Sequence, residues 1–206
     1  MKTKALIVCS ETNINISVLK DKYYIVGVER GCLDLIEKNV NIDYAISDFD
    51  SVTKKEFEVI NSKCKNIFKL KAEKDTLDGV AAIEYVNNNL KVNEILFIVK
   101  PSKRVDFNLS IIELVYKYNV KILNDDSVVF KIDSGITNLE YKKFDSFNYL
   151  SLFALKDSII TLKNMKYSVK DYNLAAFSSN AFSNELKNEQ DAEIISNNEL
   201  MVMFTK

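Results

Sequence analysis

The most informative absence from this chain is histidine. None of its 206 residues is histidine or tryptophan, and it has only one proline, four glycines and three cysteines. Without histidine, hydrolases whose serine or cysteine is activated by histidine are excluded, and so are zinc sites of ordinary composition. The few glycines form neither a G-x-x-x-x-G-K-[ST] loop nor a G-x-G-x-x-G turn. Phosphate binding would therefore depend on a carboxylate-held metal, on lysine and arginine, and on helix N-termini.

The cysteines and the apolar runs favour a cytoplasmic location, and the charge argues against nucleic-acid binding. Cys9, Cys32 and Cys64 are odd in number and lack metal-ligand spacing, so we expect reduced thiols. The net charge is -1 and the charges are spread along the chain, which leaves no basic face for nucleic acid. The first apolar run ends at Cys9, too early for a secretory signal, and no later run is long enough to span a bilayer. The sequence predicts a cytoplasmic protein that binds neither nucleic acid nor membrane.

The pattern of apolar residues changes near residue 125. Before that point, short β-branched runs alternate with segments of helical spacing, which predicts an α/β fold with a mostly parallel sheet flanked by helices. The strands expected there are residues 5–8, 23–28, 44–47, 67–70, 95–99 and 120–123.

The second half of the chain shows only short strand-like runs and no convincing helix. These runs are residues 127–132, 150–154, 158–162 and 200–204. Such spacing favours an antiparallel sandwich or a small barrel. We therefore expect an α/β catalytic domain at residues 1–124 and an all-β sandwich domain at residues 125–206.

Two acidic turns follow predicted strands. Asp48 and Asp50 stand one residue apart after one strand, and Asp75 and Asp78 follow the next. Two such carboxylates cannot both face a sheet interior, but at the carboxyl end of a strand they can converge where ligands of open α/β sheets bind. Oxygen ligands without histidine or thiol suit Mg²⁺, which often shares its ligand shell with phosphates. The two turns together predict a metal–phosphate site.

The simpler interpretation of Asp48-Phe49-Asp50-Ser51 is the start of a helix. Aspartate and serine are common in turns and at N-caps, and a helix is expected to open at Lys54. Ser51 or Thr53 could cap it. The second acidic turn is what favours the metal over the cap.

Three short motifs stand in an informative order along the chain. They are D-F-D-S at residues 48–51, K-D-T-L-D at residues 74–78 and S-N-E at residues 183–185. In this order the chain resembles the thiamine pyrophosphokinase family over nearly its whole length. The motifs of that family are D-F-D-S, K-D-x-T-D and S-N-E, and the second match departs only in having Leu77 where threonine is expected.

Two further motifs of the family are altered here. The first family motif, D-G-G, corresponds to Glu29-Arg30-Gly31, and a fourth, G-G-R-x-D-H, corresponds to residues 102–107. In that stretch Arg104 and Asp106 match, but the glycines are absent and Phe107 replaces a polar residue. These changes affect the loop that would face phosphate more than they affect the fold.

The resemblance implies Mg²⁺-dependent transfer of pyrophosphate from ATP to the hydroxyl of thiamine, giving thiamine diphosphate and AMP. It implies a catalytic, metal-binding set of Asp48, Asp50 and Asp78, with Glu29 as a weaker ligand. It also implies ATP contacts from Ser51, Lys74, Asp75, Lys103 and Arg104. Thiamine would be bound by Asp106, Ser183 and Asn184, in an active site between the subunits of a homodimer.

Two alternatives remain open from the sequence. Residues 45–52 also fit the D-x-D-x-[TV] pattern of haloacid-dehalogenase-like phosphatases, in which Asp48 would be the nucleophile. That motif would then lie on a third strand rather than the first, and residues 74–78 and 183–185 would have no role. The other alternative is a non-catalytic relative that binds thiamine or nucleotide without turnover.

Overall fold

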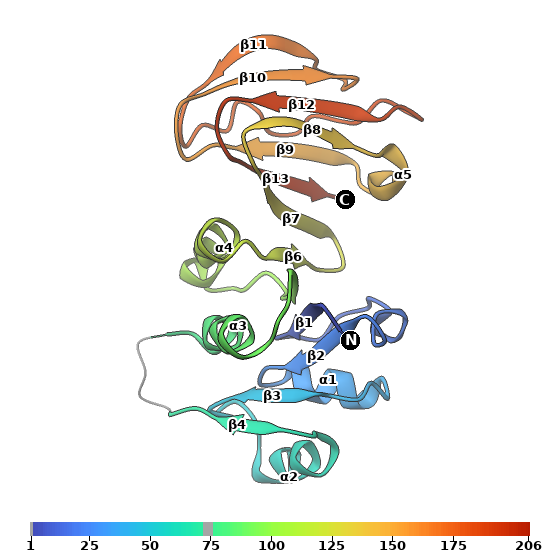
Figure 1. Cartoon of the computed structure of the whole chain (residues 1–206), viewed down its shortest axis with the longest axis vertical. Coiled ribbons are helices and arrows are strands. Elements are labelled where there is room, and N and C mark those ends of the chain that lie inside the picture. Colours follow the sequence, from blue (N-terminus) through green and yellow to red (C-terminus); the bar gives the residue numbers. More distant parts are fainter. Residues whose placement is uncertain (1, 72–75) are drawn as a thin grey trace. The chain divides into compact units, whose positions relative to one another are not determined.

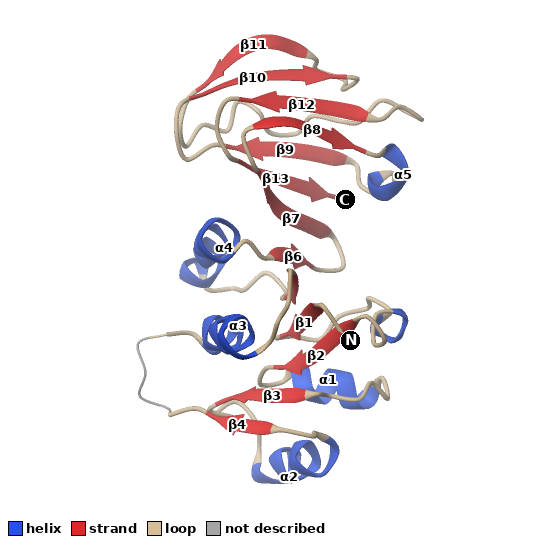
Figure 2. Cartoon of the chain, viewed as in Figure 1, coloured by secondary structure: helices blue, strands red, loops and turns tan. Residues whose placement is uncertain are grey.

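The computed structural model describes residues 2–71 and 76–206 of the chain. The chain divides into two compact units, Met1–Asp125 and Asp126–Lys206. The first unit is built of strands and helices in alternation, and the second is built almost entirely of strands (Figure 2).

A parallel sheet forms the centre of the first unit. Its strands are β1 (Lys4–Val8), β2 (Tyr23–Gly27), β3 (Tyr44–Ser47), β4 (Ile67–Lys69), β5 (Glu94–Ile98) and β6 (Lys121–Leu123). They lie in the order β4-β3-β2-β1-β5-β6, and each neighbouring pair is parallel. In β1, the side chains of Ala5 to Val8 are fully buried, because helices cover both faces of the sheet. The mostly parallel sheet expected from the sequence is confirmed.

Helices cover the two faces of this sheet. They are η1 (Ile16–Val18), α1 (Gly31–Glu37), α2 (Lys54–Lys63), α3 (Asp78–Asn89) and α4 (Val105–Tyr118). The connections from β2 to β4 step across the sheet in one direction, and those from β4 to β6 step in the other. Because such crossovers are right-handed, α1 and α2 lie on one face and α3 and α4 on the other (Figure 1). Within the described ranges, no helix combines the length and the apolar character that crossing a membrane requires.

The start of α2 settles which residue caps it. The Thr53 hydroxyl accepts a hydrogen bond from the Glu56 backbone N–H at 3.3 Å, and the Thr53 N–H donates to the Glu56 carboxylate at 2.7 Å. This reciprocal pair is a capping box. Of the two candidates in the sequence, Thr53 is therefore the cap, which leaves the Ser51 side chain available for other contacts.

The second unit is a sandwich of two antiparallel sheets. Its strands are β7 (Ser127–Ile132), β8 (Gly135–Leu139), β9 (Tyr149–Phe153), β10 (Ser158–Lys163), β11 (Val169–Leu174), β12 (Ala192–Ser196) and β13 (Leu200–Thr205). One sheet has the order β7-β13-β9 and the other β11-β10-β12-β8. Leu152, Ile194 and Val202 come from both sheets and are fully buried in one apolar cluster. The predicted antiparallel fold is thus confirmed.

Three strands and one short helix of this unit were not expected from the sequence. The strands are β8, β11 and β12, and the helix is α5 (Tyr141–Phe144). Strand β11 shows why, because four of its six residues are exposed and its sequence lacks an apolar alternation. It lies at the edge of its sheet and pairs with β10 through the backbone, and this pairing leaves no signal in side-chain hydrophobicity.

Gly31 allows α1 to begin directly against the end of β1. A Cβ atom at this position would lie 2.0 Å from the backbone oxygen of Val8. Because that oxygen belongs to a buried strand, Gly31→Ala should lower the free energy of unfolding by about 2–3 kcal/mol, the upper part of the range for overpacked sites. Urea denaturation followed by circular dichroism would measure it. The control is Glu37→Ala, an exposed position in the same helix, and equal stability of the two variants would contradict the expectation.

Candidate active site at the carboxyl edge of the parallel sheet

Three carboxylates gather at the carboxyl ends of neighbouring strands. Glu29 follows β2, while Asp48 and Asp50 follow β3. Each offers one carboxylate oxygen, and these three oxygens lie within 4.8 Å of one another. Such an arrangement brings together Asp48, Asp50 and Glu29 of the predicted metal set. Hard oxygen donors at this spacing have the chemistry that Mg²⁺ prefers.

The turn after β3 separates its charged residues from its apolar one. Phe49 has a φ of 59° and is only 7 % exposed, and its ring lies 5.0 Å from that of Phe57 in α2, centroid to centroid. Its two neighbours remain accessible, with Asp48 half-buried and Asp50 exposed. The Asp50 N–H donates to the Asp48 carboxylate at 3.2 Å. Burial of Phe49 therefore directs both aspartates away from the core.

Ser47 links the remaining carboxylate to this group. It is the last residue of β3, is fully buried, and lies with its Oγ 2.7 Å from the Asp78 carboxylate. The same hydroxyl also contacts the Glu29 carboxylate. Since a hydroxyl carries one proton, it can donate to only one of the two at a time. The sequence analysis missed Ser47, although a small polar residue ending an apolar strand directly before Asp48 is a usable signal.

Asp78 stands at the start of α3, where the helix dipole favours a negative charge. It is half-buried beside Cys9. Burial and, second, the Asp78 carboxylate raise the pKa of the Cys9 thiol far above its usual value. Cys9 therefore stays protonated and leaves the chemistry of this edge to oxygen ligands.

The loop before α4 contains the predicted phosphate-facing arginine. The Arg104 guanidinium donates to the Asp106 carboxylate from Nε at 3.2 Å and from Nη2 at 2.5 Å. It also lies 4.0 Å from the centroid of the Phe107 ring. The hydrogen bond from Arg104 holds the pKa of Asp106 below its usual value. Because both side chains are exposed, this pair contributes little stability and an anion could compete for the arginine.

The side chain of Asn108 closes the loop before α4, which lacks the glycines of the family motif. Its side chain accepts from the Ser102 N–H at 2.7 Å and donates to the Ser102 carbonyl at 2.8 Å. Lys103 lies exposed in the loop that these bonds close. Two further predicted residues, Lys74 and Asp75, lie outside the described residues.

Ser183 and Asn184, which are predicted to bind thiamine, belong to the second unit. Asn184 is buried, and its side chain accepts from the Tyr167 N–H at 2.9 Å and donates to the Tyr167 carbonyl at 3.0 Å. Ser183 is exposed, has a φ of 57°, and donates its N–H to the Ser151 hydroxyl at 3.0 Å. The Asn184 side chain thus holds the backbone of Tyr167, while the Ser183 side chain stays at the surface.

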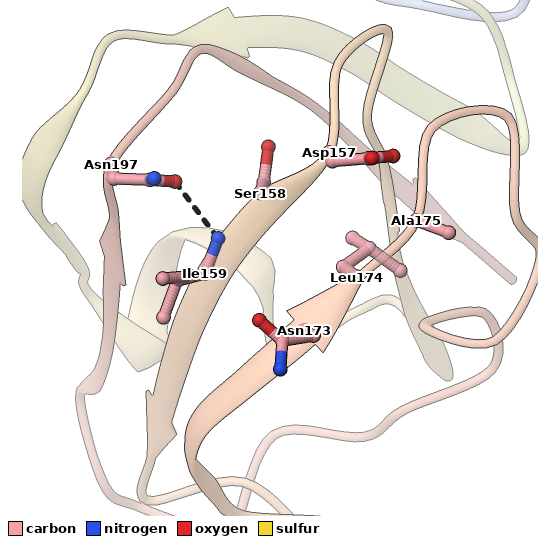
Figure 3. A pocket seen from close by; sticks show the side chains of 7 residues that line it. All are labelled: Asp157, Ser158, Ile159, Asn173, Leu174, Ala175 and Asn197. Atoms are coloured by element: carbon pink, nitrogen blue, oxygen red, sulfur yellow. Dashed lines mark hydrogen bonds between the residues drawn. The ribbon is translucent and has the colours of Figure 1, made fainter.

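The second unit also has a surface hollow of about 430 Å³ (Figure 3). It is lined by Asp157, Ser158, Ile159, Asn173, Leu174, Ala175 and Asn197. The Asn197 side chain accepts from the Ile159 N–H at 2.8 Å, and Asp157 accepts from the Ala176 N–H at 2.8 Å. These polar groups hold strand ends together, and among the described residues no predicted site residue lines the hollow.

The family of the chain follows from comparison with known proteins. Residues 16–130, more than half of the chain, match the model described as the thiamin pyrophosphokinase catalytic domain. The chain belongs to the thiamin pyrophosphokinase family. Residues 136–201 match a second model, the thiamin pyrophosphokinase vitamin B1 binding domain, in the expected order. The resemblance inferred from the sequence motifs is confirmed.

Individual relatives agree with this result. The thiamine pyrophosphokinase of Bacillus subtilis (strain 168) is 25 % identical in an alignment of 169 residues, which covers 78 % of this chain and 77 % of that protein. The crystal structure of the thiamine pyrophosphokinase from Bacillus subtilis superposes with a TM-score of 0.86 at 20 % identity, covering 100 % of this chain and 99 % of that one. The thiamin pyrophosphokinase from Geobacillus thermodenitrificans gives 0.84 at 21 %, covering 99 % and 98 %. The two structures confirm the fold.

Phe49 should contribute strongly to the stability of the first unit. Phe49→Ala removes the buried ring and its contact with Phe57, so we expect a loss of about 3 kcal/mol or more in the free energy of unfolding. Phe49→Leu retains most of the apolar volume at the same backbone conformation and should lose less than half as much. Urea midpoints would compare the two variants. Equal midpoints for wild type and Phe49→Ala would show that the ring does not anchor the turn.

Proposed function

We propose that the chain transfers pyrophosphate from ATP to the hydroxyl of thiamine, in a Mg²⁺-dependent reaction that yields thiamine diphosphate and AMP. The observation that carries the proposal is the cluster of Glu29, Asp48 and Asp50 at the carboxyl edge of the sheet, inside the stretch that matches the family's catalytic domain. The match of residues 136–201 to the vitamin B1 binding domain supports thiamine as the acceptor.

The donor set fits a magnesium ion. In the proposal Asp48 and Asp50 are its main protein ligands, with Asp78 close by through Ser47. When bound, Mg²⁺ would neutralise negative charge on the phosphates of ATP. The proposed ligands are carboxylate oxygens and include no histidine or thiolate, which agrees with a preference for this cation.

The basic residues before α4 suit the phosphates of ATP. Arg104 and Lys103 are exposed, and their loop leads directly into the N-terminus of α4, where backbone N–H groups favour anions. The exposed pair of Arg104 with Asp106 is weak enough to be exchanged for a phosphate. Lys74, Asp75 and Ser51 remain proposed ATP contacts from the family motifs.

Thiamine would be held by residues of both units in a homodimer. In the proposal Asp106 comes from the α/β domain of one subunit, and Ser183 and Asn184 come from the β domain of the other. The proposed domains are residues 1–124 for ATP and Mg²⁺, and residues 125–206 for thiamine and dimerisation.

The reaction itself needs positioning and one proton transfer. The thiamine hydroxyl oxygen forms a bond to the β-phosphorus as the bond from that phosphorus to the AMP oxygen breaks, and an aspartate of the cluster takes the hydroxyl proton. No covalent intermediate with the protein is required, which agrees with a chain that has no histidine and whose Cys9 thiol stays protonated. Family membership favours this reaction over the phosphatase with Asp48 as nucleophile.

A product assay tests the proposal. The purified protein is incubated with ATP, Mg²⁺ and thiamine, and we expect AMP and thiamine diphosphate in equal amounts. Release of inorganic phosphate from small phosphoesters would instead identify the phosphatase. Calorimetric binding of thiamine without either product would identify the non-catalytic relative.

The aspartates of the turn should be required for turnover. Asp48→Asn or Asp50→Asn removes one charge from the cluster, so we expect the rate of thiamine diphosphate formation to fall at least ~10²-fold, the scale of one lost transition-state contact. The matched control is Glu58→Gln, which neutralises an exposed carboxylate on α2. Circular dichroism should show all three variants folded. Near-normal turnover of either aspartate variant would exclude that residue as a ligand.

A further inference from the structure

The Glu29 side chain spans the whole turn that carries the two aspartates. Its Oε1 accepts hydrogen bonds from the Ser47 hydroxyl and from the Phe49 N–H, the latter at 2.7 Å. Its Oε2 accepts from the Ser51 N–H at 3.2 Å and from the Ser51 hydroxyl. One carboxylate thus holds the turn before, within and after the aspartate pair.

These bonds occupy most of the acceptor capacity of Glu29. An ionised carboxylate has about four lone-pair sites, two on each oxygen. The Phe49 N–H and the two donors of Ser51 take three of them, and the Ser47 hydroxyl, which is shared with Asp78, can take the fourth. A cation bound to Glu29 would compete with these donors.

Glu29 and Phe49, which are joined by one of these hydrogen bonds, both have an unfavourable backbone conformation. Glu29 has a φ of 49° and Phe49 a φ of 59°, and the left-handed region is costly for residues other than glycine. Residues hold such conformations when the surrounding structure fixes them. The carboxylate of Glu29 and the buried ring of Phe49 together supply that restraint.

We propose that Glu29 is a positioning residue, which holds the turn of residues 48–51 in the shape that binds the cation, and that it is not itself a ligand of the cation. This inference rests on the proposed function only for what the turn binds. It gives a physical reason for glutamate at this place. Aspartate is one methylene shorter, so its carboxylate could not reach both Ser47 and Ser51 from the same backbone position.

A double-mutant cycle tests whether Glu29 and Ser51 act on cation binding through the same turn, and a crystal structure with the cation then separates a positioning residue from a ligand. Mn²⁺, a hard cation, is titrated by electron paramagnetic resonance into wild type, Glu29→Gln, Ser51→Ala, Ser51→Thr and the double variant Glu29→Gln/Ser51→Ala, without ATP or thiamine. The amide of Glu29→Gln turns one acceptor into a donor facing the N–H groups of the turn. We expect about 10–100-fold weaker Mn²⁺ binding, the usual effect of losing a group that orients metal ligands.

The expected pattern is that the two single changes do not add. Ser51→Ala should weaken binding, Ser51→Thr should restore it, and the double variant should match Glu29→Gln within about twofold, because both changes release the same turn. If Glu29 acted on cation binding independently of Ser51, its loss would cost as much in the Ser51→Ala background as in wild type. Full additivity, or unchanged binding by Glu29→Gln, would overturn the proposal.

A crystal structure with Mn²⁺ gives an independent result should Glu29→Gln fail to fold. We expect the cation on Asp48 or Asp50, with the oxygens of Glu29 still on Phe49 and Ser51. An oxygen of Glu29 at bonding distance, about 2.1 Å for the related Mg²⁺, would overturn the proposal. Because no substrate is present, failure to form thiamine diphosphate would disprove the proposed function and leave this result standing.

Discussion

Burial of one aromatic ring between two charged residues is the constraint on which the site depends. Phe49 is almost fully enclosed against Phe57, while Asp48 and Asp50 on either side are charged and costly to bury. Here the backbone satisfies both demands in a tight turn with positive φ at Phe49. Folding of the core therefore fixes the direction of the carboxylates.

The parallel sheet brings Glu29 close to the turn of residues 48–51. Because β2 and β3 are adjacent and parallel, their carboxyl ends lie at one edge, and Glu29 comes within reach of residues about twenty positions later. Its carboxylate accepts two backbone N–H groups there, at Phe49 and Ser51. This chain has Glu29-Arg30-Gly31 in place of the D-G-G motif of the family. The hydrogen bonds of Glu29 show what the glutamate does at this position. Arg30 is exposed and pairs with Glu56 of α2 at 3.7 Å.

The altered fourth motif, residues 102–107, can also be related to contacts in the structure. Glycines usually permit a backbone to approach phosphate closely, and this chain instead closes the loop with the side chain of Asn108 on Ser102. Phe107, in place of a polar residue, packs under the guanidinium of Arg104. Side-chain contacts therefore shape this loop. The fold is kept at identities near 20 %.

Much of the fold and part of the site could be predicted from the sequence, because hydrophobic period and turn composition are local properties. They located all six strands of the first unit and the turn with Asp48 and Asp50, but they missed β11, an edge strand held by backbone pairing. Contacts between residues distant in the chain could not be predicted in this way. The sequence alone determined which acidic residues stand at strand ends. Only the tertiary structure decided that Glu29 accepts its hydrogen bonds from that turn, because those contacts depend on loop conformations and on the register of neighbouring strands.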